Sequence, residues 1–219
     1  MSLPERVAVV VLAKDARTSK TRLTVEPSRR QQIAWCLAAT TIRTALAARS
    51  VGDVYVVTSD LHIAADAEAA GAHVVPEGSP LGMNRAAALG RRHTKVASPD
   101  SAIAVLVADL PCLDPNDLDG LIGEFRERRR PLFVADHHGV GTTLLINDAL
   151  TPMGIAFGRG SAHMHRRMGY EPARRSIRGL RLDLDTAEDL QHLTAPNPAL
   201  RSELARISAA APLNLAIMA

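Results

Sequence analysis

Three aspartates carry the clearest indication of chemistry in this sequence. Asp109 follows the apolar run 103–108, whose β-branched residues are typical of a strand buried on both faces of a parallel sheet. A proline two positions later cannot continue the strand, so we expect Asp109 at the carboxyl end of a central strand, where open α/β sheets bind ligands. Asp183 and Asp185 belong to a predicted extended segment and therefore point to the same side. If the three carboxylates converge, their mutual repulsion requires a cation between them.

Basic side chains in segment 14–23 give the second indication. This segment follows the first predicted strand and contains Lys14, Arg17, Lys20 and Arg22, but no glycine. It is therefore not a Walker loop, in which backbone amides hold phosphates. Its position on the ligand side of the sheet favours phosphate binding by the side chains over a simple solvated loop.

Two later loops combine glycines with polar groups. Gly82 and Asn84 lie in a loop rich in Pro and Gly, where the backbone can approach a planar ligand and the amide can contact a base edge; a plain turn explains the segment equally well. In segment 137–143 the hydroxyl of Thr142 could hold an oxyanion, although a hairpin turn would also explain its glycines.

A second candidate anion site lies at residues 157–165. Gly158 and Gly160 precede Ser161, which we expect to cap a short helix, and Arg159 is adjacent. His163 and His165 are two positions apart on that helix and face different directions, so a shared metal ion is not expected; we place them at the surface or beside the substrate.

The elements that must position these residues follow from hydrophobic periodicity. The pattern predicts a βαβαβ opening typical of the nucleotide-binding half of a doubly wound sheet, hence an α/β fold with right-handed crossovers. The predicted strands are 7–13, 53–58, 74–75, 103–108, 132–136, 143–146 and 180–184. The predicted helices are 28–48 with Ser28 as cap, 61–70, 86–96, 115–129 capped by Asp114, 161–168, and 187–193 capped by Thr186, followed by an apolar tail over 199–219.

Composition narrows the function further. The chain has 219 residues, 47% hydrophobic and 22% charged, and we expect one domain over 1–219, with its core at about 7–193 and a tail at 196–219. No apolar run is long enough for a membrane helix and no secretory signal precedes the first strand, so we expect a cytoplasmic protein. Arginine clusters at 17–22, 126–130 and 166–181 favour a phosphate-rich partner, but aromatic residues make up only 3%, which favours a small molecule over nucleic acid. Cys36 and Cys112 are predicted to be buried free thiols.

These motifs, in this order, resemble those of the CofC/FbiD family, the 2-phospholactate or phosphoenolpyruvate guanylyltransferases of deazaflavin coenzyme biosynthesis. The resemblance covers residues 7–193 and rests on Lys14, Lys20-Thr-Arg-Leu, Asn84, Ala108-Asp-Leu-Pro, Gly139-Val-Gly-Thr, Phe157-Gly-Arg-Gly-Ser and Leu182-Asp-Leu-Asp-Thr. It implies a three-layer α/β/α sandwich with a mostly parallel mixed sheet, of the nucleotide-diphospho-sugar transferase type (GT-A, Rossmann-like). It also implies transfer of GMP from GTP to a phosphorylated three-carbon acid, with release of pyrophosphate and hand-over of the product to the next enzyme of the pathway.

The resemblance, together with the charge and position of the side chains, suggests a role for each candidate residue. Two magnesium ions would be held by Asp109, Asp183 and Asp185. GTP would be bound by Lys14, Lys20, Arg22, Gly82 and Asn84, with Asp109, Lys20 and Arg22 acting in catalysis. The resemblance places the acceptor on Thr142, Gly158 and Ser161. Arg159 joins them because it lies beside a predicted helix start, although Arg159-Gly160 and His137-His138 depart from the family pattern.

Other functions are compatible with parts of this pattern. A nucleotidyltransferase with another acceptor, such as 3-phosphoglycerate, molybdopterin or a sugar phosphate, is the nearest, although the glycine-rich loop usual after the first strand of such enzymes is absent. A non-catalytic nucleotide- or RNA-binding module would bind without magnesium and form no product. A glycosyltransferase could also use the Asp183-Leu-Asp185 pair.

Overall fold

A mixed sheet forms the centre of the molecule. The computed structural model describes residues 6–23, 25–79, 82–148, 151, 153–174 and 177–185, together with residues 200, 202, 204 and 206. Within these residues the sheet has seven strands in the order β3-β2-β1-β4-β6-β5-β7. The core is built on the central strands, which are buried on both faces. The sheet is mostly parallel and flanked by helices, as the sequence predicts.

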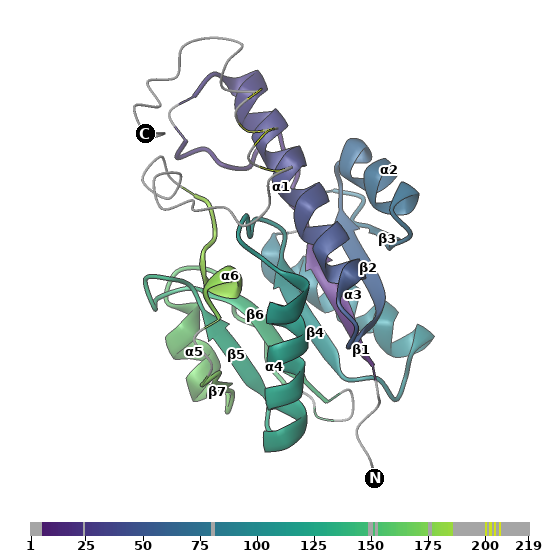
Figure 1. Ribbon diagram of the computed structural model, residues 1–219, viewed down its shortest axis with the longest axis vertical. Coiled ribbons are helices and arrows are strands. Elements are labelled where there is room, and N and C mark those ends of the chain that lie inside the picture. The colour runs from purple at the N-terminus through teal and green to yellow at the C-terminus, as the bar shows by residue number, and fades with distance from the viewer. Residues whose placement is uncertain are drawn as a thin grey trace.

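The first half of the sheet is parallel. β1 (Val7–Leu12) lies between β2 (Val51–Thr58) and β4 (Ile103–Val107), and β2 also pairs with β3 (His73–Pro76). Because β1 and β4 are parallel neighbours, their carboxyl ends lie side by side at one edge of the sheet. Two connections in opposite directions place their helices on opposite faces. Figure 1 shows α1 (Pro27–Ala47) on the near face and α3 (Met83–Ala97) on the far face.

The second half of the sheet mixes directions. β6 (Thr142–Asn147) is antiparallel to both β4 and β5 (Leu132–Ala135), while the short β7 (Glu171–Pro172) is parallel to β5. The remaining helices are α2 (Leu61–Ala69), α4 (Pro115–Arg128), α5 (Ser161–Arg167) and α6 (Arg178–Arg181). The antiparallel insertion of β6 brings the 136–142 turn to the same edge of the sheet as the ends of β1 and β4.

Three sequence expectations about elements need correction. Residues 180–184 do not form a strand: α6 ends at Arg181, and the following residues run past the end of β4, where the Leu184 amide donates to the Asp109 carbonyl at 3.1 Å. α1 is capped by Glu26, whose carboxylate accepts from the Ser28 and Arg29 amides, rather than by Ser28. Gly160 occupies the N-cap position of α5, and Ser161 is the first helical residue. The predicted cap Thr186, the helix 187–193 and most of the tail lie outside the described residues.

Two further expectations can be compared with the structure. Both cysteines are free, with Cys112 buried as predicted but Cys36 only half-buried. Among the helices in the described ranges, none has the length and apolar character needed to cross a membrane.

Candidate active site

A pocket of about 640 Å³ opens where the strands β1, β4 and β5 end. Its walls come from segments far apart in the sequence, because the sheet order brings β1, β4 and β6 together. The lining residues include Lys14, Thr18, Ser19, Lys20, Thr21, Arg22, Met83, Asp109, Asp136, His138, Val140, Gly141, Thr142, Gly158, Arg159, Asp183 and Asp185. Most of the residues singled out in the sequence therefore lie in one cavity.

Asp60, at the start of α2, anchors the loop that follows β1. Its carboxylate accepts hydrogen bonds from the Ala16 amide at 3.0 Å and the Trp35 indole at 3.1 Å, while also capping α2 through the His62 amide. Asp60 is buried, so these bonds are shielded from water. This anchor fixes the path of the loop that carries the pocket lysines, a function the sequence did not reveal.

Lys20 connects two of the three candidate aspartates. Its ammonium bonds to Asp109 and lies 3.1 Å from Asp185 Oδ1, although only 5% of its side chain is exposed. Burial by itself would lower the pKa of Lys20, but the negative charges of Asp109 and Asp185 outweigh burial and raise the pKa. The lysine is therefore firmly charged, and its backbone adopts φ 54°, a left-handed conformation costly for a residue with a side chain.

Asp183 is the aspartate that this single cation does not balance. Burial raises the pKa of Asp183 to about 7, and the negative charges of Asp109 and Asp185 act in the same direction. His137 Nδ1 lies 3.6 Å from its carboxylate. The pocket thus holds a carboxylate cluster with more negative charge than Lys20 neutralises, which is an environment that favours an additional cation.

The donor chemistry of this cluster fits a hard divalent cation, but the arrangement of the side chains does not yet surround one. Carboxylate oxygens are the ligands that Mg²⁺ prefers, and the buried Asp109 Oδ1 accepts no hydrogen bond from the described residues. Within the described ranges, however, no three side chains of His, Cys, Asp or Glu are grouped closely enough to hold a metal ion. The Lys20 ammonium lies between Asp109 and Asp185, so a divalent ion could bind both only if the ammonium moved.

The 136–141 turn forms the opposite wall. The Asp136 carboxylate accepts from the Val140 amide at 2.9 Å and the Gly141 amide at 2.7 Å, which closes the turn. A Cβ on Gly141 would lie 2.4 Å from Asp136 Oδ2, so any other residue there would displace the carboxylate that closes the turn. Arg181 donates to the Asp136 carbonyl at 3.1 Å and supports the turn from outside. The sequence pattern indicated the glycines of this turn but not the role of Asp136. The position of Asp136 at the end of a predicted strand could have indicated that role.

The four predicted acceptor residues lie at or beside this wall. Thr142, Gly158 and Arg159 line the pocket. Ser161 does not line it, but its buried Oγ has no hydrogen-bond partner among the described residues. The predicted GTP contacts Lys14, Lys20 and Arg22 line the pocket on the other side.

Asn84 performs a structural task in this conformation. Its amide nitrogen donates to the Phe157 carbonyl at 3.2 Å, and its oxygen accepts from the Phe157 amide at 2.6 Å. It thereby ties α3 to the segment that carries Gly158 and Arg159. Gly82, at the N-cap of α3 with φ 83°, is not among the lining residues. A contact of either residue with a nucleotide base stays a prediction.

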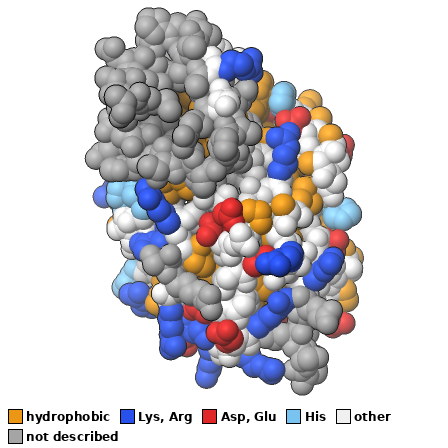
Figure 2. All heavy atoms as spheres, in the orientation of Figure 1, with side chains coloured by type: hydrophobic (Ala, Val, Ile, Leu, Met, Phe, Trp, Pro, Cys, Tyr) orange, Lys and Arg blue, Asp and Glu red, His pale blue; other side chains and the backbone are white. Residues whose placement is uncertain are grey.

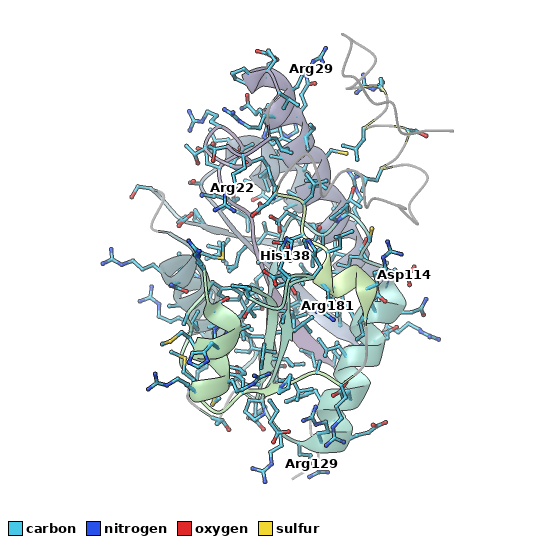
Figure 3. All side chains as sticks on the ribbon, turned by 90° about the vertical axis from the view of Figure 1, so that its left-hand side faces the viewer. Arg22, Arg29, Asp114, Arg129, His138 and Arg181 are labelled. Atoms are coloured by element: carbon cyan, nitrogen blue, oxygen red, sulfur yellow. The ribbon has the colours of Figure 1, made fainter. Side chains whose placement is uncertain are left out.

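The first and second arginine clusters, 17–22 and 126–130, lie apart, whereas Arg181 of the third donates to the Asp136 carbonyl beside the pocket. Figure 3 shows Arg22 and His138 close to the middle of the molecule, whereas Arg129 lies at the far end of α4. Several Lys and Arg side chains spread over the lower part of the face in Figure 2. Within the described residues, only the first cluster contributes most of its members to the pocket lining.

Solved structures show which class of fold this is. The structure matches a protein from Desulfovibrio desulfuricans G20 assigned as a nucleotide-diphospho-sugar transferase, with a TM-score of 0.66, 16% identity and coverage of 96% of both chains. It also matches a cytidylyltransferase from Leptospira borgpetersenii, with a TM-score of 0.55, 16% identity and coverage of 87% of this chain and 85% of that chain. The fold is therefore that of the nucleotide-diphospho-sugar transferases of the GT-A type.

The sequence places the chain within this class. A family profile described as the MobA-like NTP transferase domain matches residues 29–210, and the chain belongs to this family of nucleotidyltransferases. The phosphoenolpyruvate guanylyltransferase of Thermomonospora curvata is 36% identical over 212 residues, 94% of this chain and 91% of that protein. The protein of the same name from Streptomyces scabiei is 37% identical over 190 residues, 84% of this chain and 88% of its own.

Proposed function

We propose that this protein transfers GMP from GTP to phosphoenolpyruvate or 2-phospholactate and releases pyrophosphate, as a step in the biosynthesis of a deazaflavin coenzyme. The relatives at 36–37% identity are named phosphoenolpyruvate guanylyltransferase, and they align over most of the chain. The observation that carries the proposal is the pocket in which Lys20 joins Asp109 and Asp185, with Thr142 and Arg159 on the opposite wall. Cations for a triphosphate and donors for a phospho-acid thus face the same cavity.

The chemistry requires no general base. The acceptor phosphate monoester is already an anion near neutral pH, since its second pKa is about 6, and can attack the α-phosphorus of GTP directly. The protein must bring two anions together and stabilise the departing pyrophosphate. We assign this task to Lys14, Lys20 and Arg22 on the nucleotide side, and to Thr142, Gly158, Arg159 and Ser161 on the acceptor side.

Asp109, Asp183 and Asp185 are the residues that would hold magnesium. A related fold, the glucosyl-3-phosphoglycerate synthase of Mycobacterium tuberculosis, was solved in complex with Mg²⁺ and uridine diphosphate. When bound, the metal would neutralise phosphate charge in the pocket. Lys20 would bind phosphate oxygens of the nucleotide in place of its two carboxylate partners, since phosphate oxygens are equally good partners for an ammonium group.

A product assay tests the proposal. The purified protein is incubated with Mg²⁺, one of four nucleoside triphosphates, and phosphoenolpyruvate, 2-phospholactate or 3-phosphoglycerate, and products are identified by mass. We expect a guanylyl adduct of one of the first two acids. Asp109→Asn should lower the rate more than about a hundredfold, a loss typical for removal of a group that stabilises transition-state charge. Asp66→Asn, which changes a half-buried aspartate on α2 outside the pocket lining, is the matched control. Undiminished turnover by Asp109→Asn would refute the assignment.

A further inference from the structure

His165 is a buried histidine whose two ring nitrogens both have defined partners. It lies on α5 with 0% of its surface exposed. Nε2 accepts a hydrogen bond from the Ala156 amide at 3.0 Å, and Nδ1 lies 2.9 Å from the hydroxyl oxygen of Thr142. The rings of Phe157 and Tyr170 contact it edge-on, with centroids at 5.6 and 5.5 Å. It is therefore a polar group in an apolar shell, and Thr142 connects it to the pocket.

The partners determine which nitrogen carries the proton. A backbone amide can only donate, so Nε2 must be unprotonated. Burial lowers the pKa of His165 to about 4, so the ring is neutral near pH 7. The single ring proton is therefore on Nδ1, and Nδ1–H donates to the Thr142 hydroxyl oxygen.

This tautomer fixes the direction of the Thr142 hydroxyl. Its oxygen already accepts a hydrogen bond from His165, so its own hydrogen must be donated to something else. Among the described residues, no acceptor for that hydrogen is found besides the histidine nitrogen, which is itself a donor. Thr142 lines the pocket, and Ser161, one helical turn before His165, contributes another buried hydroxyl without a partner.

We propose that His165 is a positioning residue for the phospho-acid: its Nδ1–H orients the Thr142 hydroxyl as a donor to an anionic oxygen of the acceptor. The inference rests on the proposed function for the identity of the acceptor, but not for the direction of the hydroxyl. Because His165 touches neither the nucleotide side of the pocket nor the aspartates, its effect is confined to acceptor binding.

The competing explanation is that His165 only packs the aromatic shell and holds Ala156. The two explanations differ in whether the Nδ1–H donor of His165 affects binding of the acceptor. In His165→Gln the amide oxygen can still accept from the Ala156 amide, but the donor near Thr142 is lost; His165→Asn keeps an N–H donor close to the Nδ1 position and loses the acceptor for Ala156.

Steady-state kinetics with phosphoenolpyruvate and GTP separate the two roles. We expect His165→Gln to raise KM for phosphoenolpyruvate roughly tenfold, the value of one hydrogen bond to a charged group, with KM for GTP nearly unchanged. His165→Asn should have a KM for phosphoenolpyruvate close to that of the unaltered protein. In a Thr142→Val background, His165→Gln should add no further loss. The histidine acts by packing, and the proposal is wrong, if His165→Gln raises KM for phosphoenolpyruvate equally in the Thr142→Val background. The same conclusion follows if His165→Asn raises this KM and His165→Gln does not.

A spectroscopic measurement tests the inference without any acceptor. Long-range ¹H–¹⁵N correlation spectra of the unaltered protein at pH 7 report which ring nitrogen of His165 carries the proton. A proton on Nδ1 supports the proposal, and one on Nε2 overturns it even if the histidine variants do not fold.

Calorimetric titration with phosphoenolpyruvate separates the hypothesis about the acceptor from the hypothesis about the positioning role of His165. Absence of binding contradicts the proposed acceptor, whereas equal binding by the folded His165→Gln variant contradicts only the positioning role.

Discussion

Lys20 combines two features that normally oppose each other: it is almost fully buried and it is charged. The cost of burying an ammonium is offset because Asp109 and Asp185 both contact it. One positive charge cannot balance three carboxylates, and burial together with the negative charges of Asp109 and Asp185 raises the pKa of Asp183. The lysine thus acts as an internal counter-ion in the nucleotide-free protein, and it competes with any divalent ion for the same oxygens.

This competition predicts the effect of Lys20→Met on metal binding. Methionine keeps the length and apolar stem of the side chain and removes the charge, so Mn²⁺ in the absence of nucleotide should bind roughly tenfold more tightly or better, a gain of about 1.4 kcal/mol. Isothermal titration with MnCl₂ measures it. Lys95→Met, in the last turn of α3 outside the pocket lining, should not change the affinity. An unchanged or weaker affinity in Lys20→Met would show that the ammonium does not occupy the metal's place.

At the scale of the element, α5 is attached to the sheet through a histidine that must stay neutral. The pKa of His165 is about 4 in the folded protein, against an ordinary value of 6.5. Between these pH values the unfolded chain binds a proton at His165 that the folded protein does not bind. The contribution of His165 to the free energy of unfolding is therefore fully present above about pH 6.5 and is lost as the pH falls toward 4.

The size of this loss can be measured by comparison with a variant. Each pH unit between the two pKa values removes about 1.4 kcal/mol, so the total approaches roughly 3 kcal/mol. Urea unfolding of the unaltered protein at pH 7 and pH 4.5 includes the contributions of all other groups, whereas the same pair of measurements on His165→Asn omits this histidine. We expect the variant to lose less stability between the two pH values. Equal losses would mean that the ring does not change its protonation on unfolding.

The parallel half of the fold could be predicted because its signal is local. β1 and β4 are continuous apolar runs that end at a basic loop and at Asp109, and a residue's position at the end of such a run predicts the ligand edge. The antiparallel β6 and the turn before it were also visible as short apolar runs around glycines.

Contacts between distant segments could not be predicted in the same way. The pairing of Lys20 with Asp109 joins residues 89 positions apart, and no local pattern encodes it. Segment 182–185 has the alternation of a strand, yet the edge beside β5 is taken by β7, so this segment runs past the end of β4 instead. The sequence placed His165 at the surface or beside the substrate, but the residue is buried. Its burial depends on Phe133, Phe157 and Tyr170, which come from other elements.

At the scale of the whole molecule, positive charge is spread more widely than the pocket. The chain carries a net charge of +3, with one basic cluster at the pocket and another at the end of α4. Such a distribution raises the local concentration of any polyanion near the surface, but only the pocket cluster can contact a bound triphosphate directly. Direct contacts and general attraction therefore make separable contributions.

Two matched arginine substitutions separate these contributions. Arg22→Ser removes a guanidinium that lines the pocket 3.9 Å from Asp185, and should raise KM for GTP roughly ten- to hundredfold, as expected for a lost charged hydrogen bond. Arg130→Ser removes the same charge at the distant end of α4 and should change KM for GTP less than about twofold at 0.15 M salt, where charges beyond about 8 Å are screened. Initial rates over a range of salt concentrations provide the measurement. If both substitutions raise KM equally, and salt abolishes both effects, the basic clusters act only through the general field and Arg22 does not contact the nucleotide.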